Sequence, residues 1–207
     1  MKNKKIAIPL KLIICFLFAV FDYYISLFAK IHFKPLFLDT LFEITSAFAF
    51  GPVYGIICVL FKRVWNIILI RDLSRWPSFL YSFCTIGAVL IVCPFNKKLL
   101  QNEKNKVMLF TKLFLLSMII CLEMSITGGV IGRIVALIQH TPYSMTVQTD
   151  SFMQIFASFI HNTLVLEIIS RIPVNIIDRI ITIFIPYGVY RLIKALNKDD
   201  GGDLYIL

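Results

Sequence analysis

The sequence predicts an all-α integral membrane protein in which six transmembrane helices form one bundle, with an extra helical element in the outer loop before the last helix. Of its 207 residues, 58% are hydrophobic and 14% are aromatic, whereas soluble domains are roughly 45–50% apolar. Apolar runs close to the about 20 residues that cross a bilayer follow one another along the chain. Lysine and arginine gather at the ends of these runs, where they orient the helices.

Residues 1–196 form the predicted transmembrane domain, and residues 197–207 form a short polar C-terminal tail. The formal net charge of +9 is assigned to helix ends that contact lipid phosphates, so nucleic-acid binding is not expected. The five cysteines lie inside apolar runs without a CxxC pair. We therefore expect no disulfide framework, no metal site and no cofactor.

The first three helices are predicted from the first three apolar runs. The first helix, over residues 6–29, follows a basic N-terminus and lacks a small-residue cleavage site, so we interpret it as a retained helix rather than a signal peptide. The next two runs meet at Gly51-Pro52. Because proline lacks the N–H that would continue a helix, this step predicts a break between helices over residues 36–50 and 53–70.

Acidic residues lie inside the first two of these runs. A carboxylate is costly in lipid, so Asp22 is expected either to pair with Lys30 at the membrane interface or to face other helices. Asp39 and Glu43 are four residues apart, which places both acids on one face if the second run is helical from its start. Packing alone does not require such a pair.

The fourth and fifth helices flank the most basic link of the chain. The fourth is predicted over residues 78–93, ending near Pro94, and the fifth over residues 107–139. The fifth is too long for one straight crossing and carries glycines close to Glu123 and Arg133. Helices interrupted by glycine beside charged residues often line a cavity, so we expect an interruption here.

The topology depends on residues 151–171, which are predicted either as a seventh crossing or as a helical element of the outer loop. The last helix is predicted over residues 173–196 and has a basic end. Six crossings place the basic N-terminus and this basic end on the cytoplasmic side together, as the positive-inside rule requires. The sequence therefore favours six crossings, with both termini in the cytoplasm and the protein in the cell membrane.

Two passages resemble a known family of membrane proteins. They read LDTLFEITSAFAFGPVYGIICVLFKRVWNIIL and RIPVNIIDRIITIFIPYGVYRLI. The first is similar to the second-to-third-helix passage of the substrate-binding S components of energy-coupling factor (ECF) vitamin transporters. The second resembles the last helix of the riboflavin-type members, and the order of features is similar over residues 9–196.

The riboflavin-type motif of the last helix is matched only in part. Pro173 and Asn175 match the motif, whereas Val174 stands where the family has phenylalanine and Asp178 stands where it has lysine. The charge reversal argues against riboflavin itself as the ligand.

The resemblance implies an importer subunit that captures a vitamin-like small molecule from outside in a pocket of the outer half. It also implies an ECF membrane coupling subunit and ATPase subunits as partners, with Cys15 and Ala19 approximating the docking surface on the first helix. No GxSxG, HExxH or P-loop motif is present, so we do not expect an enzyme. The alternative is a membrane sensor or scaffold module of the same fold without transport activity.

The candidate ligand-binding residues are polar side chains of the later helices, since ionisable groups inside membranes often mark functional sites. Each charged member has the alternative role of a structural ion pair between helices. His161 has the alternative role of a hydrogen-bonding residue at the interface. The candidates are Glu123, Thr127, Arg133, His161, Asn162, Asn175, Asp178 and Arg179.

Overall fold

The computed structural model describes residues 8–33, 36–70, 73–101, 103–144 and 147–199, and every regular element within them is helical. The predicted start of the first helix at residues 6 and 7 lies outside the described residues. The same holds for residues 200–207 of the predicted polar tail. In chain order the elements are α1 (Ile8–His32), α2 (Leu41–Phe50), α3 (Pro52–Ile70), the 3₁₀ helix η1 (Leu73–Tyr81), α4 (Ser82–Phe95), the π-helical turn η2 (Asn96–Leu100), α5 (Lys106–Ile138), α6 (Val147–Ala157), α7 (Thr163–Ile169) and α8 (Ile172–Asp199).

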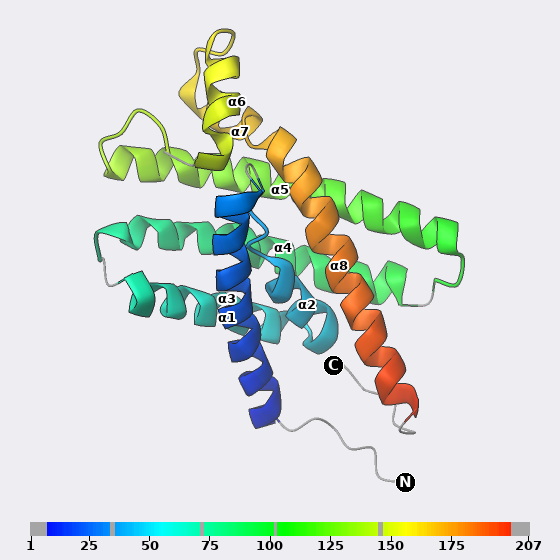
Figure 1. Ribbon diagram of the computed structural model, residues 1–207. Helices are drawn as coiled ribbons and strands as arrows, with labels where there is room; N and C mark the ends of the chain where they lie inside the picture. The colour runs from blue at the N-terminus through cyan, green and yellow to red at the C-terminus, as the bar shows by residue number, and fades with distance from the viewer. Residues whose placement is uncertain (1–7, 34–35, 71–72, 102, 145–146, 200–207) are drawn as a thin grey trace.

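The long helices form two sets that cross each other (Figure 1). Helices α3, α4 and α5 run side by side, and α1 and α8 run across them. Helix α1 packs on α3, while α8 packs on α5. Both crossing helices also contact the short helix α2, and α6 and α7 lie together at one end of the molecule.

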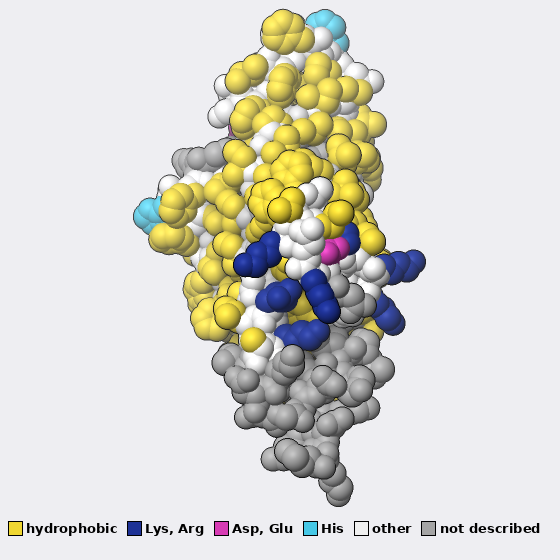
Figure 2. All heavy atoms as spheres, turned by 90° about the vertical axis from the view of Figure 1, so that its right-hand side faces the viewer, with side chains coloured by type: hydrophobic (Ala, Val, Ile, Leu, Met, Phe, Trp, Pro, Cys, Tyr) yellow, Lys and Arg dark blue, Asp and Glu magenta, His cyan; other side chains and the backbone are white. Residues whose placement is uncertain are grey.

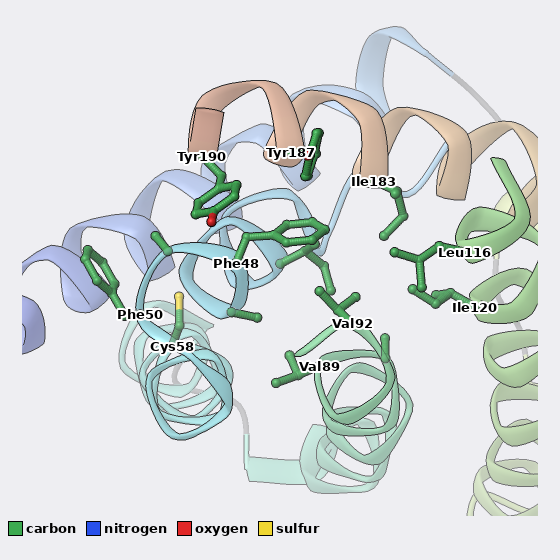
Figure 3. Packing of buried hydrophobic residues seen from close by; sticks show 14 of the residues in the cluster. Phe48, Phe50, Cys58, Val89, Val92, Leu116, Ile120, Ile183, Tyr187 and Tyr190 are labelled. Atoms are coloured by element: carbon green, nitrogen blue, oxygen red, sulfur yellow. The ribbon is translucent and has the colours of Figure 1, made fainter. Parts of the chain in front are cut away.

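Helix α2 forms the centre of the hydrophobic core. Nine of its 10 residues are buried, because α1, α3, α4 and α8 all pack on it. Phe48 of α2 is fully buried against the rings of Tyr187 and Tyr190 of α8, with ring centroids 5.6 and 6.0 Å apart (Figure 3). Val92 of α4 and Leu116 of α5 close the other side of this cluster.

The break predicted at Gly51-Pro52 is confirmed. Gly51 has φ 92°, a conformation that costs residues with a Cβ but not glycine, and Pro52 begins α3. Close packing follows the turn, since a Cβ on Gly55 would lie 2.8 Å from Val89 of α4. Glycines at these positions let α2, α3 and α4 approach one another closely.

The predicted helix over residues 36–50 is wrong at its start. Helix α2 begins only at Leu41, and the chain before it turns at Leu38, where φ is 44°. The backbone N–H groups of Phe37 and Leu38 donate to the carboxylate of Asp178 in α8, so they do not begin a helix. Asp39 therefore lies in the link before α2 and does not share a helical face with Glu43.

The predicted stop near Pro94 holds for the α-helix but not for the whole helical run, which extends to Leu100. Helix α4 includes Pro94 and ends at Phe95, and the chain continues as the π-helical turn η2. Proline removes only one backbone donor, and local π-type adjustment of the next turn lets a membrane helix accommodate it. The basic side chains Lys97 and Lys98 lie on this added turn.

Helix α5 is continuous over its 33 residues, so the interruption predicted at its glycines is wrong. The helix is about 50 Å long at 1.5 Å per residue. Its glycines serve contact with α7 instead. A Cβ on Gly129 would lie 2.5 Å from the side chain of Ile168, and one on Gly132 would lie 2.7 Å from the guanidinium of Arg171.

The segment predicted as ambiguous, residues 151–171, contains a break rather than one long helix. It includes most of α6, which has 11 residues, and all of α7, which has 7. Neither helix reaches the about 20 residues that cross a bilayer. The predicted extra helical element before the last helix is present as this pair of short helices.

Four helices of the described residues are long and apolar enough to cross a membrane, as expected for a helical membrane protein. The six crossings remain a prediction, because α2 has only 10 residues and α8 is not among the four. The four segments are Ile8–His32, Pro52–Leu69, Phe79–Leu100 and Lys106–Ile138.

Exposed lysines and arginines gather where α4 ends and α5 begins, beneath a broad apolar surface (Figure 2). The Tyr187 hydroxyl donates to the Leu100 carbonyl at 3.5 Å, which ties α8 to this region. We call this region the basic end. Its exposed cations are Lys97, Lys98, Lys104, Lys106, Arg191 and Lys194.

Candidate functional site

A first group of buried charges joins α1, α2 and α3. The Lys62 ammonium of α3 lies 3.5 Å from a carboxylate oxygen of Asp22 and 3.5 Å from one of Glu43. All three residues are nearly inaccessible, at 6%, 0% and 1% exposure. The backbone N–H of Phe42 also donates to Asp22 at 3.2 Å. Asp22 thus faces other helices, and the predicted alternative pairing with Lys30 is wrong.

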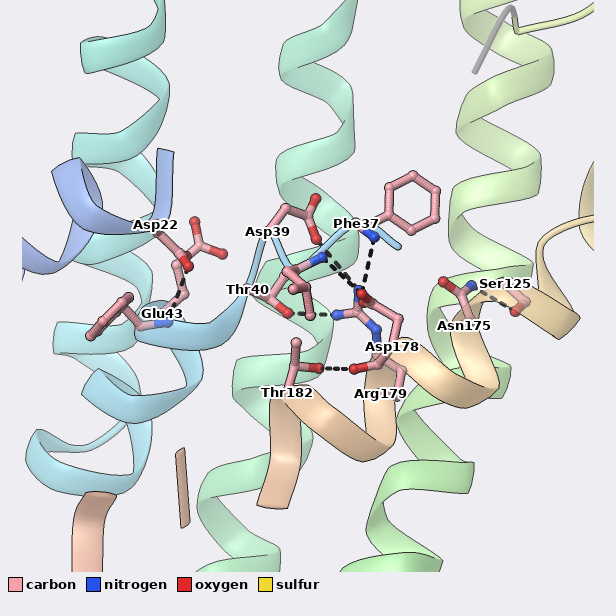
Figure 4. A network of polar contacts seen from close by, with 12 residues as sticks. Asp22, Phe37, Asp39, Thr40, Glu43, Ser125, Asn175, Asp178, Arg179 and Thr182 are labelled. Carbon is pink, nitrogen blue, oxygen red and sulfur yellow. Dashed lines mark hydrogen bonds and ion pairs between the residues drawn. The ribbon is translucent and has the colours of Figure 1, made fainter. Parts of the chain in front are cut away.

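A second group joins α8 to the link before α2 (Figure 4). The Arg179 guanidinium donates to the Thr40 hydroxyl at 2.6 Å, to the Asp39 carboxylate at 3.4 Å and to Asp178. Asp178 accepts in addition from the backbone N–H groups of Phe37 and Leu38, at 3.1 and 2.8 Å. Asp178 and Arg179 are 0% and 1% exposed.

Asp39 connects the two groups. Its backbone carbonyl accepts from the Lys62 ammonium, and its carboxylate accepts from Arg179. The Asp39 side chain is 32% exposed, whereas the Arg179 side chain is 2% exposed. The buried charges therefore reach the molecular surface at Asp39, in the link between α1 and α2 (Figure 4).

A third group of charges fixes α7 to the end of α5. Arg171 lies 3.3 Å from Glu167, and it donates to the hydroxyls of Ser144 and Tyr81 at 3.0 and 3.4 Å. Glu167 accepts from the backbone and the hydroxyl of Ser144 at 2.7 and 2.9 Å. Gly132 of α5 leaves room for this pair. These contacts hold the chain between α5 and α8 in place.

Among the predicted site residues, Asp178 and Arg179 contact each other, and Asn175 lies one turn earlier on α8. The Asn175 amide donates to the Ser125 hydroxyl of α5 at 2.9 Å (Figure 4). Asn175 is 4% exposed. The three residues form a polar strip at the start of α8, buried between α5 and the link before α2.

Glu123 and Thr127 form a separate pair on another face of α5. The Thr127 hydroxyl lies 3.2 Å from a carboxylate oxygen of Glu123. This pair faces Gly87 of α4, where an added Cβ would lie 2.4 Å from the same carboxylate. Ser125, which contacts Asn175, lies between them in the sequence and on a different side of the helix, since successive residues are about 100° apart.

The remaining predicted site residues lie near the end formed by α6 and α7. Arg133 donates to the Pro142 carbonyl at 3.2 Å. His161 is exposed in the link before α7. Asn162 is the N-cap of α7, where its side-chain oxygen accepts from the backbone N–H groups of Leu164 and Val165 at 3.0 and 3.2 Å. None of these contacts joins the three residues to the polar strip of α8.

The residues predicted to form a docking surface, Cys15 and Ala19, face the chain's own helices. Both residues are 0% exposed, because α2 and α3 pack on this face of α1. The Cys15 thiol lies 3.3 Å from the Ser46 hydroxyl of α2 and 3.6 Å from the Tyr54 carbonyl of α3. A partner subunit cannot contact these two side chains without displacing the chain's own helices.

Sequence reasoning missed Lys62 and Thr40. Lysines and arginines were expected at the ends of apolar runs, yet Lys62 lies in the middle of α3 and is buried. The signal was available, since a cation that falls inside an apolar run requires an acidic partner. Thr40 offered no comparable signal, because its role depends on contact with Arg179 across 139 residues of chain.

Several polar atoms of these groups retain unused hydrogen-bonding capacity. Buried side-chain atoms without a hydrogen-bond partner include Glu43 Oε2, Glu123 Oε2 and Arg179 Nε. Such atoms favour a further partner, because an unpaired buried polar group is costly. No group of three or more His, Cys, Asp or Glu suited to a metal ion occurs among the described residues. The unpartnered atoms can form hydrogen bonds with a further polar partner.

Comparison of the chain with family models, with curated proteins and with solved structures returned no match.

Proposed function

We propose that this protein is a substrate-capture subunit of an ECF-type importer, in which the polar groups around Arg179 hold a vitamin-like small molecule taken from outside. The single observation that carries the proposal is the connection between Arg179, which is buried, and Asp39, which is partly exposed. Buried charges inside a membrane protein are costly and often mark a substrate site. A partly exposed carboxylate gives such a group access to solvent.

The proposed orientation follows from the distribution of charge. The basic end is assigned to the cytoplasm by the positive-inside rule. Asp39 and Arg179 then belong to the outer half, together with Asn175 and the short helices α6 and α7. A ligand from outside would reach Asp39 first, and the α8 strip beneath it would supply further polar contacts.

The charge balance of the group bears on the chemistry of the ligand. In the two joined groups four carboxyl groups surround two cationic side chains. Arg63 acts on Asp39 and Glu43, and Lys30 acts on Asp39, from greater distances, so the excess of acids is confined to the residues in direct contact. This excess favours a ligand that carries positive charge or several hydrogen-bond donors. The acids are Asp22, Asp39, Glu43 and Asp178, and the cations are Lys62 and Arg179.

A specific observation favours the second candidate function, a membrane sensor or scaffold module. Cys15 and Ala19 are buried by the chain's own helices, which argues against docking of a coupling subunit through these two side chains. The charged residues of α8 also make internal ion pairs, as a purely structural network would. In this alternative, the protein would act by contacting a partner domain and would transport nothing.

Copurification distinguishes the two functions. The tagged full chain would be extracted from its native membrane in mild detergent, and the copurifying proteins would be identified by mass spectrometry. Transport predicts ATPase subunits together with a membrane coupling subunit in stoichiometric amounts. A signalling or cell-envelope protein in their place would overturn the importer proposal and support the sensor or scaffold role.

A further inference from the structure

Glu123 lies in the long helix α5, and a glycine of the neighbouring helix α4 leaves room for its side chain. Its carboxylate faces Gly87 of α4, where a Cβ would lie 2.4 Å from Oε1 and 3.0 Å from the carboxyl carbon. Any larger residue at position 87 would therefore displace the carboxyl group. The Thr127 hydroxyl, one turn further along α5, lies 3.2 Å from the same Oε1.

Glu123 differs from the acids of the three charged groups described above in having no cationic contact. In the described part of the chain, no lysine or arginine nitrogen lies within ion-pair distance of it. Its second oxygen, Oε2, is buried and has no hydrogen-bond partner. The acids that do contact lysine or arginine are Asp22, Asp39, Glu43, Glu103, Glu167 and Asp178.

An ionised carboxylate without a cation is strongly disfavoured away from water, and such a group takes up a proton instead. The side chains that face Glu123 do not supply a cation that would favour its ionised form. Thr127 is neutral, the Cys84 thiol of α4 lies near Thr127, and Arg179 of α8 acts only from a distance because it is engaged by Asp39 and Asp178.

We infer that Glu123 is a proton-binding site inside the membrane: it is held as a neutral carboxylic acid between α4 and α5 and is open to modification by an apolar carbodiimide. Its neighbours Leu122 and Ile126 are exposed on the apolar surface, so an apolar reagent dissolved in lipid can approach this part of α5. The inference does not depend on the proposed function.

The reaction with a carbodiimide requires a carboxylic acid that carries its proton, as we assign to Glu123. The carboxylic acid adds across one C=N bond of the carbodiimide. Its proton goes to the nitrogen, and its oxygen forms a bond to the central carbon, giving an O-acylisourea. Transfer of the acyl group to nitrogen then gives a stable N-acylurea. No atom is lost in either step, so the labelled peptide gains the mass of one carbodiimide molecule.

Labelling of the intact protein tests the inference directly. The protein in phospholipid vesicles would be treated with dicyclohexylcarbodiimide at neutral pH, digested and analysed by mass spectrometry. We expect the Glu123 peptide to be modified at least about tenfold more than the peptides of Asp39 and Glu103, because ionised carboxylates lack the required proton. An unmodified Glu123 peptide, or equal labelling of these acids, would overturn the inference.

Infrared spectroscopy gives a second measurement that needs no reagent. Glu123→Gln is expected to remove a C=O stretching band of a protonated carboxylic acid from the spectrum. Glu103→Gln, at the basic end, is the matched control and is expected to remove an ionised-carboxylate band instead. Loss of an ionised-carboxylate band in Glu123→Gln would contradict the assigned proton. Ligand binding plays no part in either readout, so failure here is distinguishable from failure of the proposed function.

Discussion

The guanidinium of Arg179 and the carboxylate of Asp39 lie 3.4 Å apart, although 140 residues separate them in the chain. This contact joins the start of α8 to the link that precedes the central helix α2. It also joins a buried cation to an acid that is partly exposed. Both the packing of α2 and the proposed ligand site depend on this connection.

Removal of the Arg179 charge should destabilise the protein strongly. Arg179→Gln would leave the buried Asp178 without its cation, and breaking a buried ion pair in this way costs about 3–5 kcal/mol. Thermal unfolding in detergent should show a large drop in Tm. Arg191→Gln, an exposed position on the same helix, is the control and should change stability by less than about 0.5 kcal/mol. Equal effects of the two substitutions would contradict the role given to Arg179.

Two glycines should respond to alanine in opposite directions. Gly51 has φ 92°, so Gly51→Ala should cost about 1–3 kcal/mol through backbone strain. Gly188 lies inside α8 with nothing within 4 Å of an added Cβ, so Gly188→Ala should stabilise by about 0.5–1 kcal/mol. Unfolding midpoints of the two variants measure this contrast. A stable Gly51→Ala protein would disprove the turn described between α2 and α3.

The helices could be predicted from the apolar runs, and the turn at Gly51 could be predicted from the Gly-Pro step, because both signals are local. The start of α2 could not be predicted from local signals. Residues Phe37 and Leu38 leave the helix because Asp178, far away in sequence, accepts their N–H groups. A local pattern carries no information about such a partner.

The residue types of the candidate site could be predicted from the sequence, but the contacts between these residues could not. Buried acids and arginines were recognisable as costly, and Asp178, Arg179 and Asn175 do lie together on one part of α8. The sequence placed Asn162 with them as a ligand contact, yet its side chain caps α7. Capping and ligand binding use the same amide oxygen, so residue type alone does not separate them.

Asn162 allows the capping role to be tested separately from ligand contact. Asn162→Ala removes the oxygen that accepts from Leu164 and Val165 and should cost about 1 kcal/mol. Asn162→Asp keeps an accepting oxygen and should retain stability. Hydrogen exchange of the Leu164 and Val165 amides measures the cap. Equal exchange in the wild type and in Asn162→Ala would contradict it.

The topology can be tested with single cysteines at exposed positions. Ser158 precedes α7 and Lys104 lies at the basic end. In intact cells, Ser158→Cys should react with a membrane-impermeant maleimide, whereas Lys104→Cys should react only after the cells are permeabilised, because basic links remain in the cytoplasm. Labelling of both in intact cells would exclude the proposed orientation. The reverse pattern would place the Arg179 group on the cytoplasmic side.

The basic end should show a pH dependence of its own. The Lys112 ammonium donates to Glu103 at 2.5 Å, and this hydrogen bond lowers the pKa of Glu103 below its ordinary value. The contact therefore stabilises the fold at neutral pH, and its contribution is lost as the pH falls through the lowered pKa. In Lys112→Gln, the pKa of Glu103 followed by carboxyl-carbon NMR should rise toward its ordinary value. Lys98→Gln is the control, and an equal rise there would contradict the assigned partner.

Ligand binding by the purified protein in lipid is the most direct measurement of the central claim. A thermal-shift screen of water-soluble vitamins and related compounds should identify at least one that stabilises the wild-type chain. Asp39→Asn should weaken that binding by at least about tenfold, equivalent to 1.4 kcal/mol, and Lys104→Gln should leave it unchanged. A folded wild-type protein that none of these compounds stabilises, or an Asp39→Asn variant that binds as tightly as the wild type, would contradict the account.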